Sequence, residues 1–177
     1  MYRTILIHGS IAGLIVGSIL ALTTIILPDD TSVPVRMAVG YASMLLALSA
    51  IFVGVKKHRD VDRGGIIGFW PAFGMGLAIS LVASLFYIAA WEATLGLTGM
   101  DFVGDYTRLL VNEAQAAGKS AAEIAKIEAD MSQFAANYAD PFYRLPMTFT
   151  EIFPVGVLVS LVSAALLRNS RFLPARA

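Results

Sequence analysis

Two glutamates and one arginine interrupt the apolar runs of this 177-residue chain, and they are its best candidates for chemistry. Glu92 and Glu151 lie within apolar segments, where a charged side chain is costly and is often retained for a function. Arg36 stands at the start of another apolar segment and could act as their counter-charge. If the three side chains meet at one depth, they could serve a small transporter or a proton-coupled carrier.

An interfacial position for these carboxylates is the alternative. Tyr87 and Trp91 precede Glu92, and such aromatic residues are typical of the belt at a membrane–water interface. A straight helix from Gly68 to Glu92 rises about 36 Å, which exceeds the ~30 Å hydrocarbon core of a bilayer. This length favours the interfacial interpretation.

Other stretches resemble catalytic or cofactor-binding motifs, but the residues around them exclude these functions. His58-Arg59-Asp60 has the letters of a kinase catalytic loop, but the chain lacks the accompanying motifs, and Asp60-Val61-Asp62 is expected to be a solvated turn. Gly74-Met75-Gly76 lies inside an apolar run without a preceding strand, so it is not a dinucleotide fingerprint. His8 is expected to be interfacial or bonded to the backbone. The sequence therefore assigns no catalytic, cofactor-binding or metal-binding residue, and no cofactor.

The composition indicates a membrane protein. Hydrophobic residues make up 57% of the chain and charged residues 15%, with a mean hydropathy of +0.71. Soluble domains are closer to 45–50% apolar and about 25% charged. The formal net charge is zero, which gives no reason to expect a nucleic-acid partner, and the absence of cysteine excludes disulfides and thiolate metal sites.

Four apolar runs predict four transmembrane helices, at residues 5–27, 35–55, 66–97 and 147–167. About 20 residues are enough to cross the bilayer core, so the third run must tilt, kink at Pro71 or project from the membrane. The fold class predicted is all-α: a bundle of four transmembrane helices, forming a single membrane domain over residues 1–177.

Basic residues predict the orientation of these spans. The connection between the second and third spans carries four of them, Lys56, Lys57, Arg59 and Arg63, and both termini are also basic, whereas residues 28–34 have none. Short loops rich in Lys and Arg stay on the cytoplasmic side. We therefore expect both termini in the cytoplasm, with a bacterial inner membrane as the location.

The segment 98–146 is predicted to be an extracytoplasmic helical hairpin. Apolar residues recur at helical spacing up to Gly118, a plausible C-terminal cap. Ser120 and Glu123 then have the spacing of a capping box, and an apolar stripe runs from Ile124 to Tyr138. Asp140-Pro141 is expected to end this second helix.

Small residues at four-residue intervals predict where the spans touch, because close backbone approach stabilises helix pairs in lipid. The candidate packing residues are Gly9, Gly13, Gly17, Gly68, Ala72, Gly76 and Gly156. Their contacts could lie within one chain or between chains.

The basic turn and its flanks resemble domain-of-unknown-function family 4199, a family of small bacterial four-span membrane proteins. The residues that carry the resemblance are Phe52–Asp60 (FVGVKKHRD), Gly64–Phe69 (GGIIGF), Gly74–Gly76 and Pro154–Gly156. The resemblance implies the four-span fold over nearly the whole chain. It implies no activity and no site residues.

The leading functional hypothesis is a non-enzymatic assembly or accessory subunit of unknown biochemical activity. A transporter using Glu92, Glu151 and Arg36 is the second, and an enzyme acting on lipid or envelope substrates through the same carboxylates is the third. The partners expected are the lipid bilayer and a membrane-protein partner or a second copy of the chain.

Overall fold

The computed structural model describes residues 1–28 and 31–174, and this part of the chain is helical without strands. It contains six α-helices: α1 (Tyr2–Ile26), α2 (Val33–Lys57), α3 (Phe69–Thr98), α4 (Phe102–Ala116), α5 (Ala121–Tyr138) and α6 (Pro141–Leu167). A π-helical turn, His58–Asp62, extends α2. The predicted all-α class is therefore confirmed.

Four of these helices are long and apolar enough to cross a membrane. They are α1 with 25 residues, α2 with its π-helical turn with 30, α3 with 30, and α6 with 27. Each overlaps most of one of the four predicted spans. Since about 20 residues cross the bilayer core, each helix has residues to spare for tilt or for projection into the headgroup layer.

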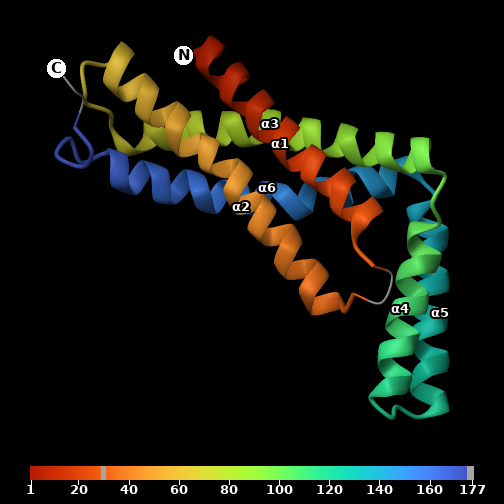
Figure 1. Cartoon of the computed structure of the whole chain (residues 1–177). Helices are drawn as coiled ribbons and strands as arrows, with labels where there is room; N and C mark the ends of the chain where they lie inside the picture. The colour runs from red at the N-terminus through yellow and green to blue at the C-terminus, as the bar shows by residue number, and fades with distance from the viewer. Residues whose placement is uncertain (29–30, 175–177) are drawn as a thin grey trace.

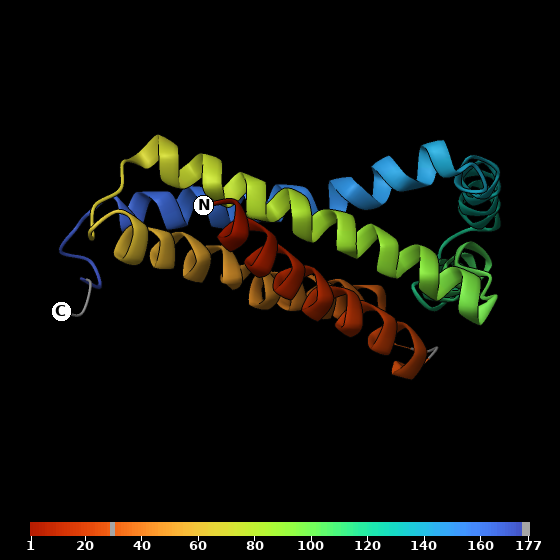
Figure 2. The ribbon, with the colours of Figure 1, turned by 90° about the horizontal axis from the view of Figure 1, so that it is seen from above.

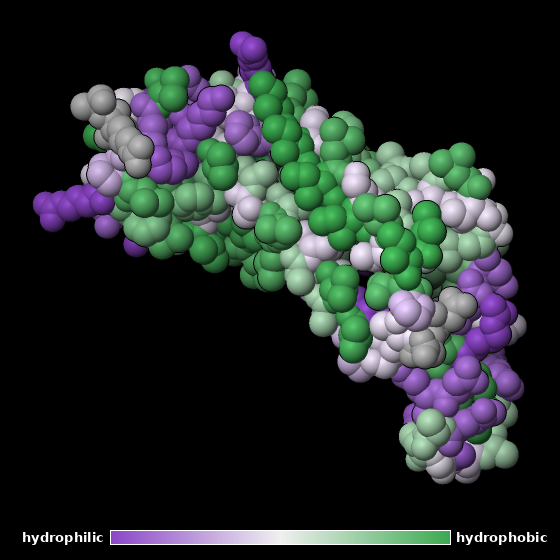
Figure 3. Space-filling model, viewed as in Figure 1, coloured by the Kyte–Doolittle hydropathy of each residue, from purple (hydrophilic) through white to green (hydrophobic). Residues whose placement is uncertain are grey.

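The four long helices pack along one another, with α3 in contact with both α1 and α6 (Figures 1 and 2). One end, called the termini end below, holds the amino terminus, the α2–α3 connection and residues 168–174, which follow α6 (Figure 1). Helices α4 and α5 pack against each other as a hairpin across the opposite end, the hairpin end (Figure 1). Hydrophilic residues gather at both ends, and a hydrophobic surface lies between them (Figure 3). This distribution matches a bilayer-embedded middle.

The predicted caps of the hairpin helices are confirmed. Gly118 follows α4 with φ 71°, a left-handed conformation that glycine adopts without steric cost. The Ser120 hydroxyl and the Glu123 carboxylate form the reciprocal bonds of a capping box at the start of α5. At α4, Asp101 Oδ1 accepts a hydrogen bond of 3.0 Å from the Gly104 N–H.

The basic connection is more helical than predicted. Instead of turning after residue 55, the chain continues through Lys57 and the π-helical turn to Asp62. An ion pair of 2.5 Å between Lys56 and Asp60 spans one helical turn and supports the continuation. The turn itself follows at Gly64 and Gly65, whose φ angles are 62° and 87°.

Two helix starts also differ from the prediction. Helix α6 begins at Pro141 rather than near residue 147, because Asp140 Oδ1 caps the Phe142 N–H at 2.9 Å and Pro141 suits the first helical position. Helix α3 begins at Phe69, which places Pro71 in its first turn, where proline requires no kink.

Glycines of α1 lie directly against α3. A Cβ atom built on Gly9 would lie 2.6 Å from the Val82 Cβ. One on Gly17 would lie 2.6 Å from the Ala90 Cβ, and one on Gly13 would overlap Phe86. Real Cβ contacts are not this short, so the close packing of α1 against α3 requires glycine, which has no side chain, at these positions.

The α3–α6 contact is built in the same way. A Cβ on Gly76 would lie 2.7 Å from the Ser160 Oγ, and one on Gly156 would overlap Ser80. Ala72 is fully buried in the same region of α3. Gly68, expected to belong to this stripe, is instead the exposed N-cap of α3, and a Cβ on it would meet only Pro71.

Candidate functional site at the hairpin end

An ion pair joins α3 to α6 where the hairpin begins. Arg144 Nε donates to Glu92 Oε1 at 2.7 Å, and Arg144 Nη2 donates to Glu92 Oε2 at 2.7 Å. Two parallel charge-assisted bonds fix both side chains in orientation as well as distance. Both are partly buried, with 16% of Arg144 and 32% of Glu92 exposed. The candidate carboxylate of Glu92 is thus paired with an arginine of a neighbouring helix.

Arg144 and Glu92 extend into a small network that includes the hairpin. Arg144 Nη1 donates to the Tyr138 carbonyl at 3.0 Å, and the guanidinium lies 5.6 Å from the centre of the Tyr138 ring. The Tyr138 hydroxyl accepts a bond of 2.6 Å from the Trp91 indole N–H. Burial raises the pKa of Tyr138, so its phenol stays neutral at physiological pH. We call Trp91, Glu92, Tyr138 and Arg144 the hairpin-end cluster.

Aromatic rings lie around this cluster and pack the hairpin onto the long helices. Trp91 meets Phe102 of α4 edge-on, with centroids 4.9 Å apart, and Phe102 lies 5.8 Å from Tyr138. Phe134 of α5 lies 5.3 Å from Tyr138. Such pairs add about 0.5–1.5 kcal/mol each beyond their buried area. The predicted apolar stripe of α5 therefore ends in this aromatic contact.

A second contact holds the hairpin to α2. Glu113 Oε1 of α4 accepts a hydrogen bond of 2.9 Å from the backbone N–H of Val33, the first residue of α2. The first N–H groups of a helix have no intrahelical acceptor, and a carboxylate there also suits the helix dipole. The hairpin is consequently attached at two separate places, to α3 and α6 by the cluster and to α2 by Glu113.

The three polar residues predicted to act together have different partners. Glu92 pairs with Arg144, while Glu151 Oε2 accepts one bond of 3.3 Å from the Tyr87 hydroxyl. Arg36 donates to the carbonyls of Thr31 at 2.9 Å and Pro28 at 2.7 Å, which closes the α1–α2 connection. The expected counter-charge of Glu92 is therefore corrected from Arg36 to Arg144.

Arg144 was missed because the last span was expected to begin near residue 147. An earlier start was signalled by Asp140-Pro141, since an aspartate N-cap followed by proline is a common helix opening. That opening places Arg144 in the first turn of α6, at the depth of Glu92 near the end of α3.

Comparison with known proteins identifies the family. Residues 8–169 match the family described as a protein of unknown function, DUF4199. The chain belongs to the DUF4199 family. Searches of curated proteins and of solved structures gave no match. The matched range contains all of α2 to α6, so the hairpin-end cluster of this DUF4199 chain lies wholly within it.

The termini end of the DUF4199 chain contains a buried arginine that the sequence marked only as a topology signal. Arg59 is fully buried, and its Nε donates to Asp60 Oδ1 at 2.6 Å. Its Nη1 and Nη2 donate to the carbonyls of Phe172 at 2.9 Å and Leu173 at 2.5 Å. Arg59 therefore fastens the segment after α6 to the end of α2.

The two histidines have local partners. His8 Nδ1 bonds the Thr4 carbonyl at 2.8 Å, which confirms the backbone-bonded imidazole predicted for it. His58 Nδ1 lies 2.6 Å from Asp62 Oδ2 within the π-helical turn. Among the residues that the structure describes, no three His, Cys, Asp or Glu side chains gather as a metal site would require.

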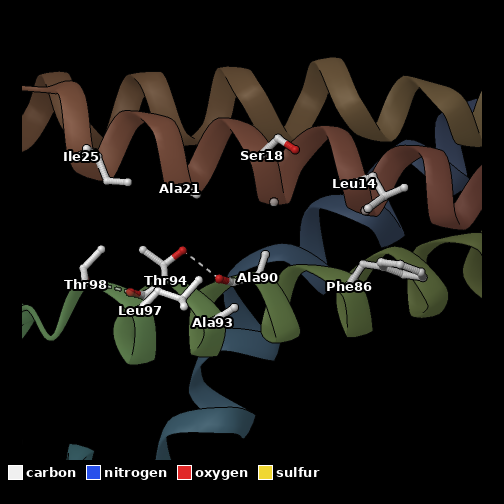
Figure 4. A pocket seen from close by; sticks show the side chains of 12 residues that line it. Leu14, Ser18, Ala21, Ile25, Phe86, Ala90, Ala93, Thr94, Leu97 and Thr98 are labelled. Carbon is white, nitrogen blue, oxygen red and sulfur yellow. Dashed lines mark hydrogen bonds between the residues drawn. The ribbon is translucent and has the colours of Figure 1, made fainter.

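A shallow apolar hollow of about 310 Å³ lies between α1 and α3 toward the hairpin end (Figure 4). Gly13, Gly17 and Ala21 line it on the side of α1, and Phe86 and Ala90 line it on the side of α3. Two of the three hydroxyls that border it are used within α3: Thr94 donates to the Ala90 carbonyl at 2.8 Å and Thr98 to the Thr94 carbonyl at 2.7 Å, while the third belongs to Ser18 of α1. In this DUF4199 chain the hollow thus offers apolar contact and little hydrogen bonding.

Proposed function

We propose that this DUF4199 chain is a non-enzymatic assembly or accessory subunit of the bacterial inner membrane, with its helical hairpin as the contact surface. The observation that carries the proposal is the double attachment of the hairpin, through Arg144–Glu92 and through Glu113 to the start of α2. A hairpin that only connects α3 to α6 would need neither of these two contacts. Held at both places, α4 and α5 present a fixed surface to a membrane partner or to a second copy.

The packing of the spans supports this proposal. Cβ atoms built on glycines at the α1–α3 and α3–α6 contacts would lie within 2.7 Å of neighbouring atoms or overlap them. Helices this close leave little room for a solute path between them. Two hollows, one between α1 and α3 and one between α3 and α6, are lined mainly by apolar residues.

The orientation belongs to the same proposal: both termini cytoplasmic and the hairpin outside. The basic residues of the termini end support it. Because the sequence has no native cysteine, single cysteines at Ser32, Asp62, Ala117 and Ser170 can be labelled individually. A membrane-impermeant thiol reagent applied outside intact cells should modify Ser32→Cys and Ala117→Cys. Labelling of Asp62→Cys instead would reverse the orientation.

The partner role is tested by photo-crosslinking in living cells. A photoreactive amino acid at Ala129, exposed on α5, should give discrete protein adducts. The same residue at Leu46, a 67% exposed position of α2, is the control and should give mainly lipid adducts. Identical adduct patterns from the two positions would refute the hairpin as the contact surface.

A proton-coupled carrier is a second candidate, favoured by Glu151. This carboxylate lies within α6, is exposed, and accepts one long bond from Tyr87. An acidic residue so lightly bonded within a span is a reasonable proton site. Proton flux measured in proteoliposomes that contain wild type or Glu151→Gln distinguishes the carrier from the accessory subunit. Proton flux that Glu151→Gln abolishes and Glu113→Gln retains would favour the carrier over the accessory subunit.

A further inference from the structure

In the described part of the termini end the acidic side chains are all paired, whereas several basic side chains are not. Two aspartates lie there, and both are engaged: Asp60 contacts Lys56 at 2.5 Å and Arg59 at 2.6 Å. Asp62 contacts His58 at 2.6 Å and lies 3.9 Å from the amino terminus. The two aspartates are thus paired with Lys56 at the end of α2, with Arg59 and His58 of the π-helical turn, and with the amino terminus.

Among the described residues, five further cations are exposed at the same end. Within the described residues none of their side chains has an acidic partner at ion-pair distance or an internal hydrogen bond. They come from the first turn of α1, the end of α2, the following turn and the segment after α6: Arg3, Lys57, Arg63, Arg168 and Arg171. Segments far apart in the sequence therefore bring basic residues to one end of the molecule (Figure 1), where hydrophilic residues gather on the surface (Figure 3). We call these five residues the basic surface.

Arg59 holds in place the segment that carries Arg168 and Arg171. Its bonds to the Phe172 and Leu173 carbonyls hold the chain after α6 in place. Phe172 also meets Phe52 of α2 edge-on, at 6.4 Å between centroids. Within the same segment, Asn169 Oδ1 accepts a bond of 3.0 Å from the Arg171 N–H. Arg168 and Arg171 are consequently carried on an ordered turn and not on a loose tail.

Exposed apolar residues lie near the cations of this basic surface in the sequence, a combination that suits the depth of the lipid headgroups. Tyr2 is 77% exposed and Trp70 is 75% exposed, and both lie close in sequence to the cations. Val61 and Ile66, on either side of Arg63, are also exposed. Tyrosine and tryptophan with neighbouring basic residues are the usual composition of a membrane–water interface. A soluble acidic partner would have no need for this apolar border.

We infer that the termini end is a binding surface for the headgroups of anionic phospholipids. Phosphate oxygens accept the forked hydrogen bonds of arginine, and an anionic leaflet attracts each basic residue near its surface. The apolar border contacts the acyl chains while the cations contact the phosphates. This binding is independent of the hairpin and goes beyond the proposed partner role.

The test uses the full-length protein in a non-ionic detergent and follows thermal unfolding. Dioctanoyl phosphatidylglycerol is titrated against dioctanoyl phosphatidylcholine, inorganic phosphate and polyglutamate. We expect saturable stabilisation by phosphatidylglycerol, reduced by raised salt, and little effect of the other three. Equal stabilisation by phosphate would assign the surface to free anions, and equal stabilisation by polyglutamate to an acidic protein. Either result would overturn the inference.

A matched pair of variants locates the binding. Arg168→Gln/Arg171→Gln removes two exposed cations from the termini end, and Lys119→Gln/Lys126→Gln removes two from the hairpin. Each cation at an anionic surface is worth about fivefold in affinity, so the first pair should weaken phosphatidylglycerol binding by roughly 25-fold. The second pair should leave it unchanged. Equal weakening by both pairs would refute the termini end as the binding surface.

Discussion

Arg144 and Glu92 form a two-point ion pair, with Nε–Oε1 and Nη2–Oε2 both at 2.7 Å. The pair joins the first turns of α6 to the last turns of α3, the two helices that lead out of and into the hairpin. The same arginine donates to the Tyr138 carbonyl, so a single side chain of α6 contacts both α3 and α5.

Removing Arg144 should destabilise the protein. Arg144→Ala leaves Glu92 without its guanidinium partner, and hydrogen bonds to charged groups contribute about 1.5–3 kcal/mol. We expect a loss of about 2–3 kcal/mol in the free energy of unfolding, measured by thermal or denaturant unfolding in detergent. Adding Glu92→Gln should restore part of it, because the stranded charge is removed.

Arg108→Ala is the control for this prediction. Arg108 pairs with Asp105 on α4, but its side chain is 72% exposed, and exposed ion pairs usually contribute between 0 and about 1 kcal/mol. A loss as large for Arg108→Ala as for Arg144→Ala would show that the Arg144 effect reflects general damage and not the ion pair.

Adding one methyl group to α1 should separate it from α3. Gly13→Ala would place a Cβ in overlap with Phe86, and overpacking of this kind costs about 1–3 kcal/mol. Gly74→Ala in α3 is the matched control, because a Cβ there meets nothing within 4 Å. Gly74→Ala should be neutral or stabilising, since alanine is the better helix former. Similar melting temperatures for the two variants would contradict the packing described here.

The start of α5 should loosen at low pH. The Ser120 hydroxyl and N–H donate to Glu123 at 2.7 and 2.9 Å, and these bonds lower the pKa of the Glu123 carboxyl. Because the folded pKa lies below the unfolded value of about 4.3, the cap stabilises α5 above that pH. The stabilisation is lost as the pH falls through the folded pKa.

Helical NMR shifts of residues 121–124, followed from neutral pH to about pH 3, measure this loss. Glu123→Gln should remove most of the pH dependence. Glu128→Gln removes a carboxylate from the same helix without changing the capping box, and should retain it. Unchanged pH dependence in Glu123→Gln would assign the titration to another group.

The elements of the fold were predictable because each has a local signal. Apolar run lengths indicated four long helices, and the Ser120–Glu123 spacing and Gly118 indicated the hairpin caps. These signals depend on neighbours within one or two helical turns. The π-helical turn after Lys57 was not predicted. The ion pair between Lys56 and Asp60 favours continued helix and the two glycines that follow favour a turn, and the sequence alone does not show where one replaces the other.

The partners of the polar residues were not predictable in the same way. Whether Glu92 meets Arg36 or Arg144 depends on which helix lies beside the end of α3, and the sequence alone does not give that arrangement. Arg59 is a similar case: a basic residue in a polar connection is normally solvated, and here it is buried because the segment after α6 folds back over it.

The bond between Trp91 and Tyr138 should control how firmly the hairpin is held. Tyr138→Phe removes the acceptor of a buried indole N–H, and an unsatisfied buried donor costs about 1–3 kcal/mol. Tyr106→Phe is the matched control, because its ring also stacks on Phe102 but its hydroxyl makes no hydrogen bond in the described structure. In hydrogen exchange, Tyr138→Phe should speed exchange in α4 and α5 and leave α1 and the middle of α3 unchanged. The same variant should weaken the crosslinks from Ala129 if the hairpin must be held rigid to meet its partner. Faster exchange throughout all six helices, or the same response to Tyr106→Phe, would mean that this hydrogen bond does not attach the hairpin specifically.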